Sequence, residues 1–487
     1  MTILEKNTDS QNLIQTEKIM ELQETIISEK DIKYQETPYR WFFLISYSLN
    51  AFSNQMQWVS FSAIATDFSI NYETALWKVY MFSLIFMIIN LILSLPEAWL
   101  LDKYSIRLSL ILAAGCNIIG SGLKLLLNID NSLTCCYIGQ IFAGLFQPAI
   151  LNSPGKIAAN WFREDIRTVI CTVCCLSVTI GTFVGFLWNL IFIKEEAEKD
   201  EYKNQVFIYF LSEFILNILF CAPTFFITKE KPDIPPSPSQ EEESNIKIPN
   251  LKESLKLLFT NFRFICLFIS YLLVVGYFDI MSTIINSLLD LYTITTKQSS
   301  IIYAVSSISG MLGSLIISRI LDKYKKFKLT MIILSISGFI FQALFTFLLE
   351  LGESKEFNAY AIGLIVYSLI SISIVSFYTI GLNYACEITY PVGESINGCI
   401  MASSPQIISI GLTFLCDYFI NDYKDKKWIS NVILLGFFAV SCIFVFLFDE
   451  KLNRQEIDQA GRIQEEAKKE GENKASTQVV TIEVAKK

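Results

Sequence analysis

Twelve apolar runs of membrane-spanning length recur along this sequence, and they constrain the fold more than any other feature. A helix that crosses a bilayer needs about 20 mostly apolar residues. The first six runs lie near 41–64, 76–100, 107–127, 134–160, 168–193 and 206–227, and the second six near 262–289, 299–319, 328–349, 358–385, 396–420 and 428–448. The sequence therefore predicts an all-α membrane protein with two sets of six spans.

Composition supports this prediction, because 52% of the residues are hydrophobic and only 18% are charged. Soluble domains carry about 25% charged residues. The net charge of -8 lies mostly outside the apolar runs, so we expect no nucleic-acid partner. The N-terminal residues are polar and mixed in charge, so we expect no signal peptide and expect the first span to serve as an uncleaved anchor.

The polar segments between and beside the runs predict five parts. These are a cytoplasmic N-terminal segment (1–40), a first six-helix bundle (41–227), a cytoplasmic central loop (228–260), a second six-helix bundle (261–448) and a charged cytoplasmic tail (449–487). The central loop is rich in Pro, Ser and charge, a composition that cannot build a core.

A repeated motif relates the two halves to each other. Residues 100–112 read LLDKYSIRLSLIL and residues 320–334 read ILDKYKKFKLTMIIL, at matching places in the two sets of spans. Each copy resembles the Asp-x-x-Gly-Arg-type loop motif of the major facilitator superfamily, although both lack the glycine. The resemblance implies a twelve-helix facilitator fold. It also implies a gating role for Asp102, Arg107, Asp322 and Lys323, against the alternative of ordinary loop charges that set topology.

Basic residues gather in the loops on one side of the predicted bundle, and acidic loops such as 195–201 lie on the other. Because cytoplasmic loops carry the excess of Lys and Arg, both termini and the central loop are predicted to be cytoplasmic. Glu97 is expected to belong to the charge network of the 100–112 loop.

The side chains give little support for catalysis or for a metal site. The chain has no His, which removes the usual metal ligand and general base, and its twelve Cys lie largely within apolar runs. We therefore predict no enzyme activity, no metal site and no cofactor. Neither a paired nucleophile and base nor a second ligand pair for Cys171, Cys174 and Cys175 is evident.

Three apolar runs carry ionisable residues, which are costly in a bilayer. Asp279 lies well inside the run 270–289, where a carboxylate costs about 2.5–3.5 kcal/mol unless it faces a bundle interior or a wet cavity. Alternatively, it pairs with a Lys or a hydroxyl, or burial keeps it neutral. Lys124 lies near a helix end, and Glu213 is either a second polar site or a protonated contact within the bundle.

The first span is unusually polar, with Asn54, Gln57 and Trp58 near its middle. Asn54 and Trp58 share a helix face, since they are one turn apart. A deep Trp ring binds a quaternary ammonium by cation–π attraction, and nearby amides can orient a hydroxyl. The alternative is a Trp that packs or lies in an interfacial belt.

Several stretches make a resemblance specific: Asn54-x-x-Gln57-Trp58, AWLLD (98–102), SPGKIAANWF (153–162), MSTIIN (281–286) and CEITYPVGESINGCIMASSPQI (386–407). They resemble the feline leukaemia virus subgroup C receptor-related family, facilitator-type carriers to whose members choline, ethanolamine and haem transport are attributed. SPGKIAANWF and YPVGE also resemble a less characterised sister branch, which leaves the subfamily open. The resemblance implies a conformational role for Glu387.

The choline site of this family resembles an aromatic cage, and three of its five positions match here. Asn54, Trp58 and Gln406 match, whereas Thr179 replaces a Gln and Asp279 replaces a Tyr. Losing a ring and gaining a carboxylate still favours a cation. We expect a preference for a primary amine that donates hydrogen bonds to Asp279, and equal choline uptake by wild type and Asp279→Asn would contradict it.

We therefore predict an alternating-access carrier for a choline-like or ethanolamine-like cationic amine, with a substrate site formed by Asn54, Gln57, Trp58, Thr179, Asp279 and Gln406. Haem or another organic metabolite is the alternative within the family, and a non-transporting receptor or sensor on the same scaffold is the alternative of another class. From the resemblance we expect a plasma-membrane protein. We also expect it to act as a monomer.

Overall fold

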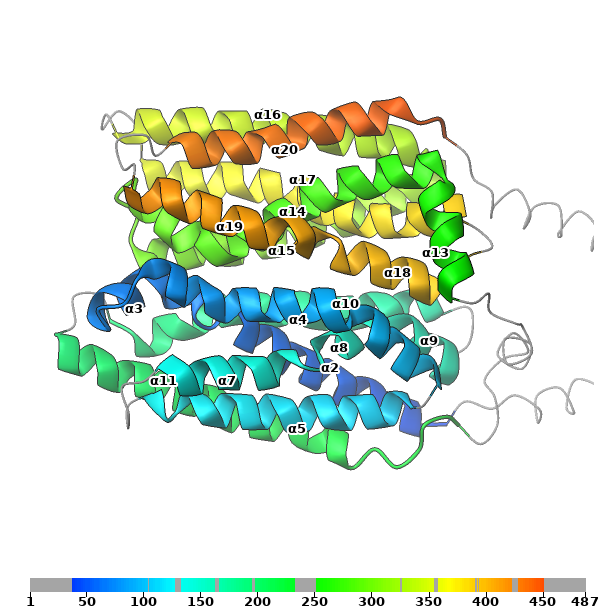
Figure 1. Cartoon of the computed structure of the whole chain (residues 1–487), viewed down its shortest axis with the longest axis horizontal. Helices are drawn as coiled ribbons and strands as arrows, with labels where there is room; N and C mark the ends of the chain where they lie inside the picture. Colours follow the sequence, from blue (N-terminus) through cyan, green and yellow to red (C-terminus); the bar gives the residue numbers. More distant parts are fainter. Residues whose placement is uncertain are drawn as a thin grey trace, which may run out of the picture.

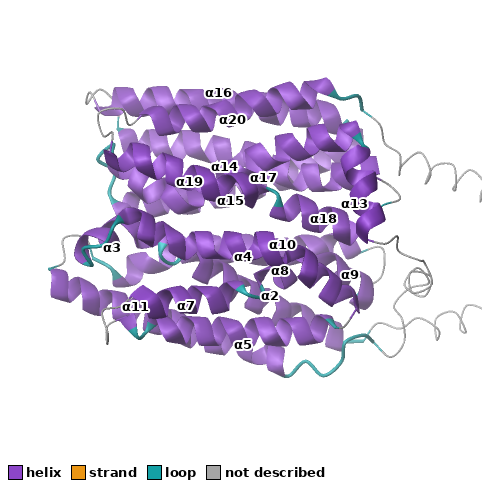
Figure 2. Ribbon diagram, viewed as in Figure 1, coloured by secondary structure: helices purple, strands orange, loops and turns teal. Residues whose placement is uncertain are grey.

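The computed structural model describes residues 37–103, 105–127, 133–162, 166–194, 198–232, 251–324, 326–353, 358–389, 392, 394–422 and 428–450, and these form helices joined by short turns (Figure 2). The predicted N-terminal segment, most of the central loop and most of the tail lie outside these ranges. Their boundaries therefore remain predictions.

The first half of the chain begins with α2 (Tyr39–Val59), the short helix η1 (Ser62–Ile64) and α3 (Ala65–Asn71). Its further helices are α4 (Leu76–Lys103), α5 (Ile106–Lys124), α7 (Leu133–Gly144), α8 (Gln147–Asn152), α9 (Pro154–Trp161), α10 (Arg167–Phe192) and α11 (Lys199–Phe225).

The second half contains α13 (Leu251–Thr260), α14 (Phe262–Asp290), α15 (Thr296–Tyr324), α16 (Phe327–Glu353), α17 (Ala359–Thr389), α18 (Glu394–Ser403), α19 (Pro405–Asp422) and α20 (Trp428–Leu447). Helix α13 lies within the segment predicted as the central loop, and it packs against α14 and α18.

Eleven spans among the described residues are long and apolar enough to cross a membrane, which confirms a multi-span integral membrane protein. The helix α2 is not among these eleven because Asn50, Asn54, Gln55 and Gln57 lower its apolar content, yet all four side chains are buried. Burial against other helices, instead of contact with lipid, makes such a helix tolerable in a bilayer. Together these helices confirm the predicted two-half architecture.

Figure 1 shows the helices of each half side by side, with the start of α2, α13 and the end of α20 at one end of the bundle. We call this the α13 end, and the opposite end, where α3 lies, the α3 end. An exposed ion pair between Glu73 and Lys199 ties the turn after α3 to the start of α11. The hydrogen bond and charge of Lys199 lower the pKa of the Glu73 carboxyl.

The predicted run 134–160 is divided into α7, α8 and α9, and two further spans are broken beside predicted site residues. The predicted run 396–420 is divided into α18 and α19 at Ser404, because Pro405 begins α19 and cannot donate a backbone hydrogen bond to the preceding turn. The predicted first span is likewise interrupted after Val59, where α2 gives way to η1. A break inside a bilayer needs other partners for its backbone groups, so side chains must supply them.

The halves meet along α10 and α15, and along α4 with α18 and α19. Toward the α3 end, Asn286 Nδ2 of α14 donates to the Ser62 carbonyl at 2.6 Å, and Ser300 Oγ of α15 donates to the Ala63 carbonyl at 3.3 Å. Both acceptors belong to η1, at the break of the first span. The second half therefore satisfies backbone groups that this break leaves open.

Glycines allow two helices of the first half to pack closely. A Cβ built on Gly120 of α5 would lie 2.5 Å from the Gly139 carbonyl oxygen of α7, and one on Gly139 would lie 2.6 Å from the Gly120 oxygen. Small residues at such crossings are typical of helix packing in membranes. The pair fixes α5 against α7 beside the polar residues of the first span.

Candidate functional site

Helix α14 is the most deeply buried span, and Asp279 lies near its middle with 7% of its surface exposed. The Asp279 Oδ2 atom accepts a hydrogen bond from Gln406 Nε2 at 3.3 Å. Gln406 is the second residue of α19, directly after the break, so the break presents this amide to α14. The structure thus brings together two of the predicted site residues from positions far apart in the sequence.

Aromatic side chains lie on the same side of the bundle as Asp279. The hydroxyls of Tyr271, Tyr303 and Tyr378 interact electrostatically with its carboxyl group. The Tyr271 and Tyr378 rings are 6.0 Å apart, and Phe186 of the first half lies 4.1 Å from the Tyr303 ring. A carboxylate among aromatic rings suits a cation, since charge and ring quadrupole both attract it.

Some buried polar atoms lack a hydrogen-bond partner among the described residues. They are the Tyr271 hydroxyl and the Gln406 Oε1 atom on the side of Asp279, and the indole N–H of Trp58 in the first half. Unsatisfied buried polar groups are costly, and each one in a native structure calls for an explanation. A polar ligand with both donors and acceptors would provide it.

The first-span residues Asn54 and Gln57 make their contacts within the first half. Asn54 Nδ2 donates to Asn117 Oδ1 and to the Ala143 carbonyl, each at 2.8 Å. Gln57 Nε2 donates to Asn217 Oδ1 at 2.9 Å and to the Asn117 carbonyl at 3.2 Å. These amide nitrogens therefore hold α2 against α5, α7 and α11.

The remaining predicted site residue, Thr179, lies half-buried on α10. Its hydroxyl donates to the Cys175 carbonyl of the same helix at 3.2 Å. Helix α10 packs against both α2 and α15, so Thr179 lies on the span that joins the first helix to the aromatic residues of the second half. Its predicted contact with substrate stays a prediction.

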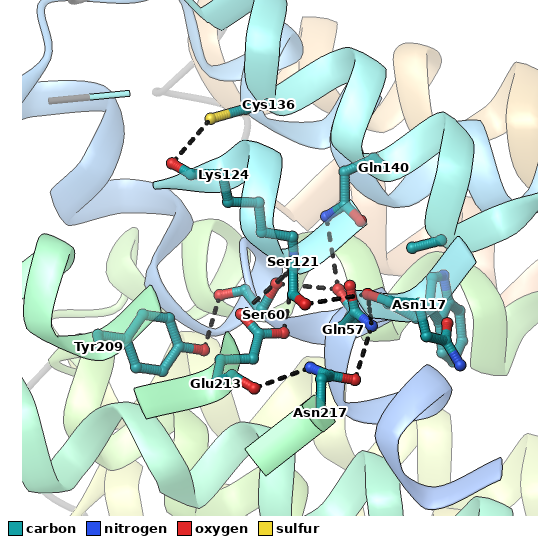
Figure 3. A network of polar contacts seen from close by, with 12 residues as sticks. Gln57, Ser60, Asn117, Ser121, Lys124, Cys136, Gln140, Tyr209, Glu213 and Asn217 are labelled. Carbon is teal, nitrogen blue, oxygen red and sulfur yellow. Dashed lines mark hydrogen bonds and ion pairs between the residues drawn. The ribbon is translucent and has the colours of Figure 1, made fainter. Parts of the chain in front are cut away.

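A charged network lies in the first half, and sequence reasoning did not predict it as a unit (Figure 3). Lys124 and Glu213 are both fully buried, with Nζ 3.1 Å from Oε1. Lys124 was expected near a helix end, which is correct, but its burial was not foreseen. The one signal in the sequence was a Lys and a Glu in two different apolar runs, without any indication that they meet.

Glu97 was predicted to belong to a loop-charge network, and this is wrong. It is buried in α4, and its Oε2 accepts the Ala149 backbone N–H of α8 at 2.7 Å. Pro148 and Ala149 are the second and third residues of this short helix, and the first N–H groups of any helix lack partners within it. The carboxylate therefore caps a helix inside the bundle.

The predicted gating residues lie toward the α13 end. Arg107 is exposed in the first turn of α5, and the exposed Lys323 has its Nζ 5.6 Å from the Tyr324 ring centre. The backbones of Asp102, Asp322 and Glu387 lie in α4, α15 and α17, and their side chains are outside the described part of the structure. Their gating role stays a prediction.

Comparison with known proteins identifies a family and several relatives of this chain. Residues 43–398 match the family model of the Major Facilitator Superfamily. An uncharacterised MFS-type transporter of Caenorhabditis elegans is 30% identical over 88% of this chain and 73% of its own length. The choline/ethanolamine transporter FLVCR1 of Felis catus is 27% identical over 86% of this chain and 74% of its own length. The choline/ethanolamine transporter FLVCR2 of Homo sapiens is 26% identical over 90% of this chain and 83% of its own length.

Solved structures show the same fold at low sequence identity. The inward-open xylose transporter XylE of Escherichia coli superposes with a TM-score of 0.65 at 12% identity, covering 85% of this chain and 97% of its own. A POT family transporter in complex with 5-aminolevulinic acid superposes with a TM-score of 0.62 at 15% identity, covering 83% and 95%. These likenesses concern the arrangement of the helices.

Proposed function

Because the chain belongs to the major facilitator superfamily of membrane transporters, we propose that it carries a small cationic amine of the choline and ethanolamine class. The observation that carries this proposal is Asp279, a buried carboxylate among tyrosines whose hydrogen-bond donor is the uncharged amide of Gln406. Two of its relatives are choline/ethanolamine transporters by name, which supports the same substrate class.

In this proposal the ammonium of the substrate binds beside Asp279, which supplies a full charge. Trp58 attracts the same cation through its ring, while Asn54, Gln57, Thr179 and Gln406 complete the site. The hydroxyl that choline and ethanolamine share has candidate partners in the unsatisfied Gln406 Oε1 atom and the Trp58 N–H. An analogue without this hydroxyl would leave these polar groups unpaired, and a site built in this way discriminates strongly against such analogues.

Alternating access would rock the two halves around this site. Opening at the α3 end requires breaking the hydrogen bonds from Asn286 and Ser300 to the η1 carbonyls. At the α13 end, contacts of α4 with α18 would separate instead, and there Ser94 Oγ lies 3.0 Å from Cys399 Sγ. We propose that Asp102, Arg107, Asp322, Lys323 and Glu387 stabilise the closed arrangement at this end.

We further propose that the protein is a monomer in the plasma membrane with both termini in the cytoplasm. The described chain supports a common side for the termini, because the start of α2 and the end of α20 lie at the same end of the bundle (Figure 1). Epitope tags at the two termini should be stained only after the cells are permeabilised. Staining of intact cells would contradict this orientation.

Uptake of radiolabelled choline and ethanolamine tests the proposed function. Cells expressing wild type, Trp58→Ala and Trp77→Ala are compared, with the amount of protein at the surface measured for each. Trp77 is the matched control because it is exposed at the start of α4. Saturable uptake that Trp58→Ala abolishes and Trp77→Ala retains would support an amine site at the first span. No saturable uptake of either amine by surface-expressed wild type would refute the amine assignment.

A further inference from the structure

Lys124 and Glu213 form an ion pair in the interior of the first half, separate from Asp279. Lys124 ends α5, Glu213 lies in the middle of α11, and neither side chain is exposed. The Lys124 Nζ atom donates to Glu213 Oε1 at 3.1 Å, to Oε2 at 3.3 Å and to Ser60 Oγ at 3.0 Å (Figure 3). The ammonium therefore has three oxygen acceptors, two on α11 and one on the residue that follows α2.

Stability alone gives a weak reason for such a pair. Ionisable groups within a bilayer are costly, and replacing a buried ion pair by apolar side chains of similar volume is often neutral or stabilising. Ionisable residues in spans are instead expected to serve function. What this pair contacts therefore indicates its role.

The contacts converge on the end of α2. Ser60 directly follows the last residue of this helix, and its carbonyl accepts a hydrogen bond from the Tyr209 hydroxyl at 3.2 Å. Asn217, whose Nδ2 donates to the Glu213 carbonyl at 2.9 Å, in turn accepts from Gln57. The Lys124 Nζ atom also lies 5.6 Å from the Phe61 ring centre. The network thus contacts the chain on both sides of Trp58.

The physical effect is to fix where the first helix ends and how that end is rotated. The last carbonyls of a helix have no partner within it and carry partial negative charge, which a nearby cation stabilises. At this helix end, Gln140 Nε2 donates to the Gln57 carbonyl at 3.4 Å, and Ser83 Oγ donates to the Trp58 carbonyl at 3.2 Å. Lys124 adds the positive charge to this set.

We propose that Lys124 and Glu213 are positioning residues whose ion pair holds the end of α2 so that Trp58 keeps its orientation toward the substrate. This inference rests on the proposed function insofar as Trp58 contacts the amine. The hold on residues 57–61 itself follows from the contacts above and needs no substrate. The two parts can therefore be tested separately.

The test uses purified full-length protein and the variant Lys124→Met/Glu213→Met, which removes both charges at similar volume. Ser212→Ala is the matched control, since Ser212 neighbours Glu213 and contacts Trp188 of α10 at 3.0 Å instead of α2. The first measurement is backbone hydrogen exchange over residues 57–64, and the second is KM and kcat for ethanolamine in cells.

We expect the double variant to reach wild-type amounts of folded protein, to exchange about tenfold faster over residues 57–64 and to raise KM about tenfold with kcat within about twofold. The control should change none of these. A folded double variant with wild-type exchange and KM would overturn the proposal, because the pair would then be purely structural.

Ser60→Ala keeps the inference falsifiable if the double variant does not fold. It removes the contact between the ammonium and α2 and leaves the ion pair intact. We expect exchange over residues 57–64 to rise about threefold, and unchanged exchange would overturn the proposal. If wild type carries no amine at all, the proposed function fails, while faster exchange in either variant still supports the hold on the first helix.

Discussion

Replacing Asp279 by Asn removes one charge and little else, so it isolates the electrostatic part of the proposed site. Asn has nearly the same shape, and its side-chain oxygen can still accept from Gln406 Nε2, now 3.3 Å from Oδ2. An ammonium about 4 Å from the carboxylate gains about 4 kcal/mol at an effective dielectric constant of about 20. Because binding also costs the ammonium its hydration, we expect a net loss of about 2 kcal/mol, which is about a 30-fold rise in KM.

The size of the loss should depend on the substrate. A primary ammonium approaches the carboxylate to hydrogen-bonding distance, whereas the methyl groups of choline hold its nitrogen farther away. We therefore expect Asp279→Asn to raise KM more for ethanolamine than for choline.

The assay for both expectations is concentration-dependent uptake of the two labelled amines, corrected for surface protein, with Asp279→Glu as the charge-retaining control. Equal uptake of each amine by wild type and Asp279→Asn would refute the reasoning, because a charge in contact with the substrate cannot be removed without effect.

Three further substitutions test helix packing, a strained turn and the interface between the halves. Gly120→Ala should lower the free energy of unfolding by about 1–3 kcal/mol, because the new methyl group meets the α7 backbone. The control Gly115→Ala, whose new methyl group would have nothing within 4 Å, should not. Thermal unfolding in detergent compares the two variants, and equal melting temperatures would contradict the packing argument. Thr293→Gly should raise the melting temperature by about one or two degrees, since Thr293 has a positive φ of 61° that a β-branched residue adopts only with strain, and a lower melting temperature would argue against that strain. Asn286→Ala should favour opening at the α3 end by about 1–3 kcal/mol, seen as faster thiol labelling of Thr66→Cys, and unchanged labelling would show that its hydrogen bond to η1 does not hold the halves together.

The sequence was sufficient to predict the helices, because apolar runs of about 20 residues leave few other options in a bilayer. It did not predict the break at Ser404, since the run 396–420 has the mean hydropathy of a single span and Pro405 is tolerated inside many membrane helices. It also missed α13, whose ten residues adjoin a segment of Pro, Ser and charge. Both features depend on neighbouring helices, which pack against α18 and α19 on either side of the break and against α13.

Candidate site residues were predictable to different degrees. Asp279 could be identified because a carboxylate deep in an apolar run is costly, and the family resemblance indicated Gln406. Their contact joins positions 127 residues apart, and no local pattern encodes it. The same holds for Lys124 and Glu213, 89 residues apart, which sequence reasoning treated as two separate residues. Pairing across helices follows from the rotation of each helix in the bundle, which hydrophobic periodicity fixes only coarsely.

Two of the buried acids, Glu213 and Asp279, differ in a way that favours different roles. Glu213 faces a lysine at 3.1 Å, so its charge is already balanced within the protein, and a substrate cation would have to displace Lys124 to use it. The hydrogen-bond donor to Asp279 is the neutral amide of Gln406, so this contact would leave a negative charge on Asp279 free to attract a ligand. Loss of the Lys124–Glu213 pair should consequently weaken the binding of ethanolamine and of choline by the same factor, because it disturbs the position of Trp58. Loss of the Asp279 charge should change the ratio between the two amines. Measuring that ratio in Asp279→Asn and in Lys124→Met/Glu213→Met separates recognition of charge from positioning of the ring, and a changed ratio in the double variant would contradict this division.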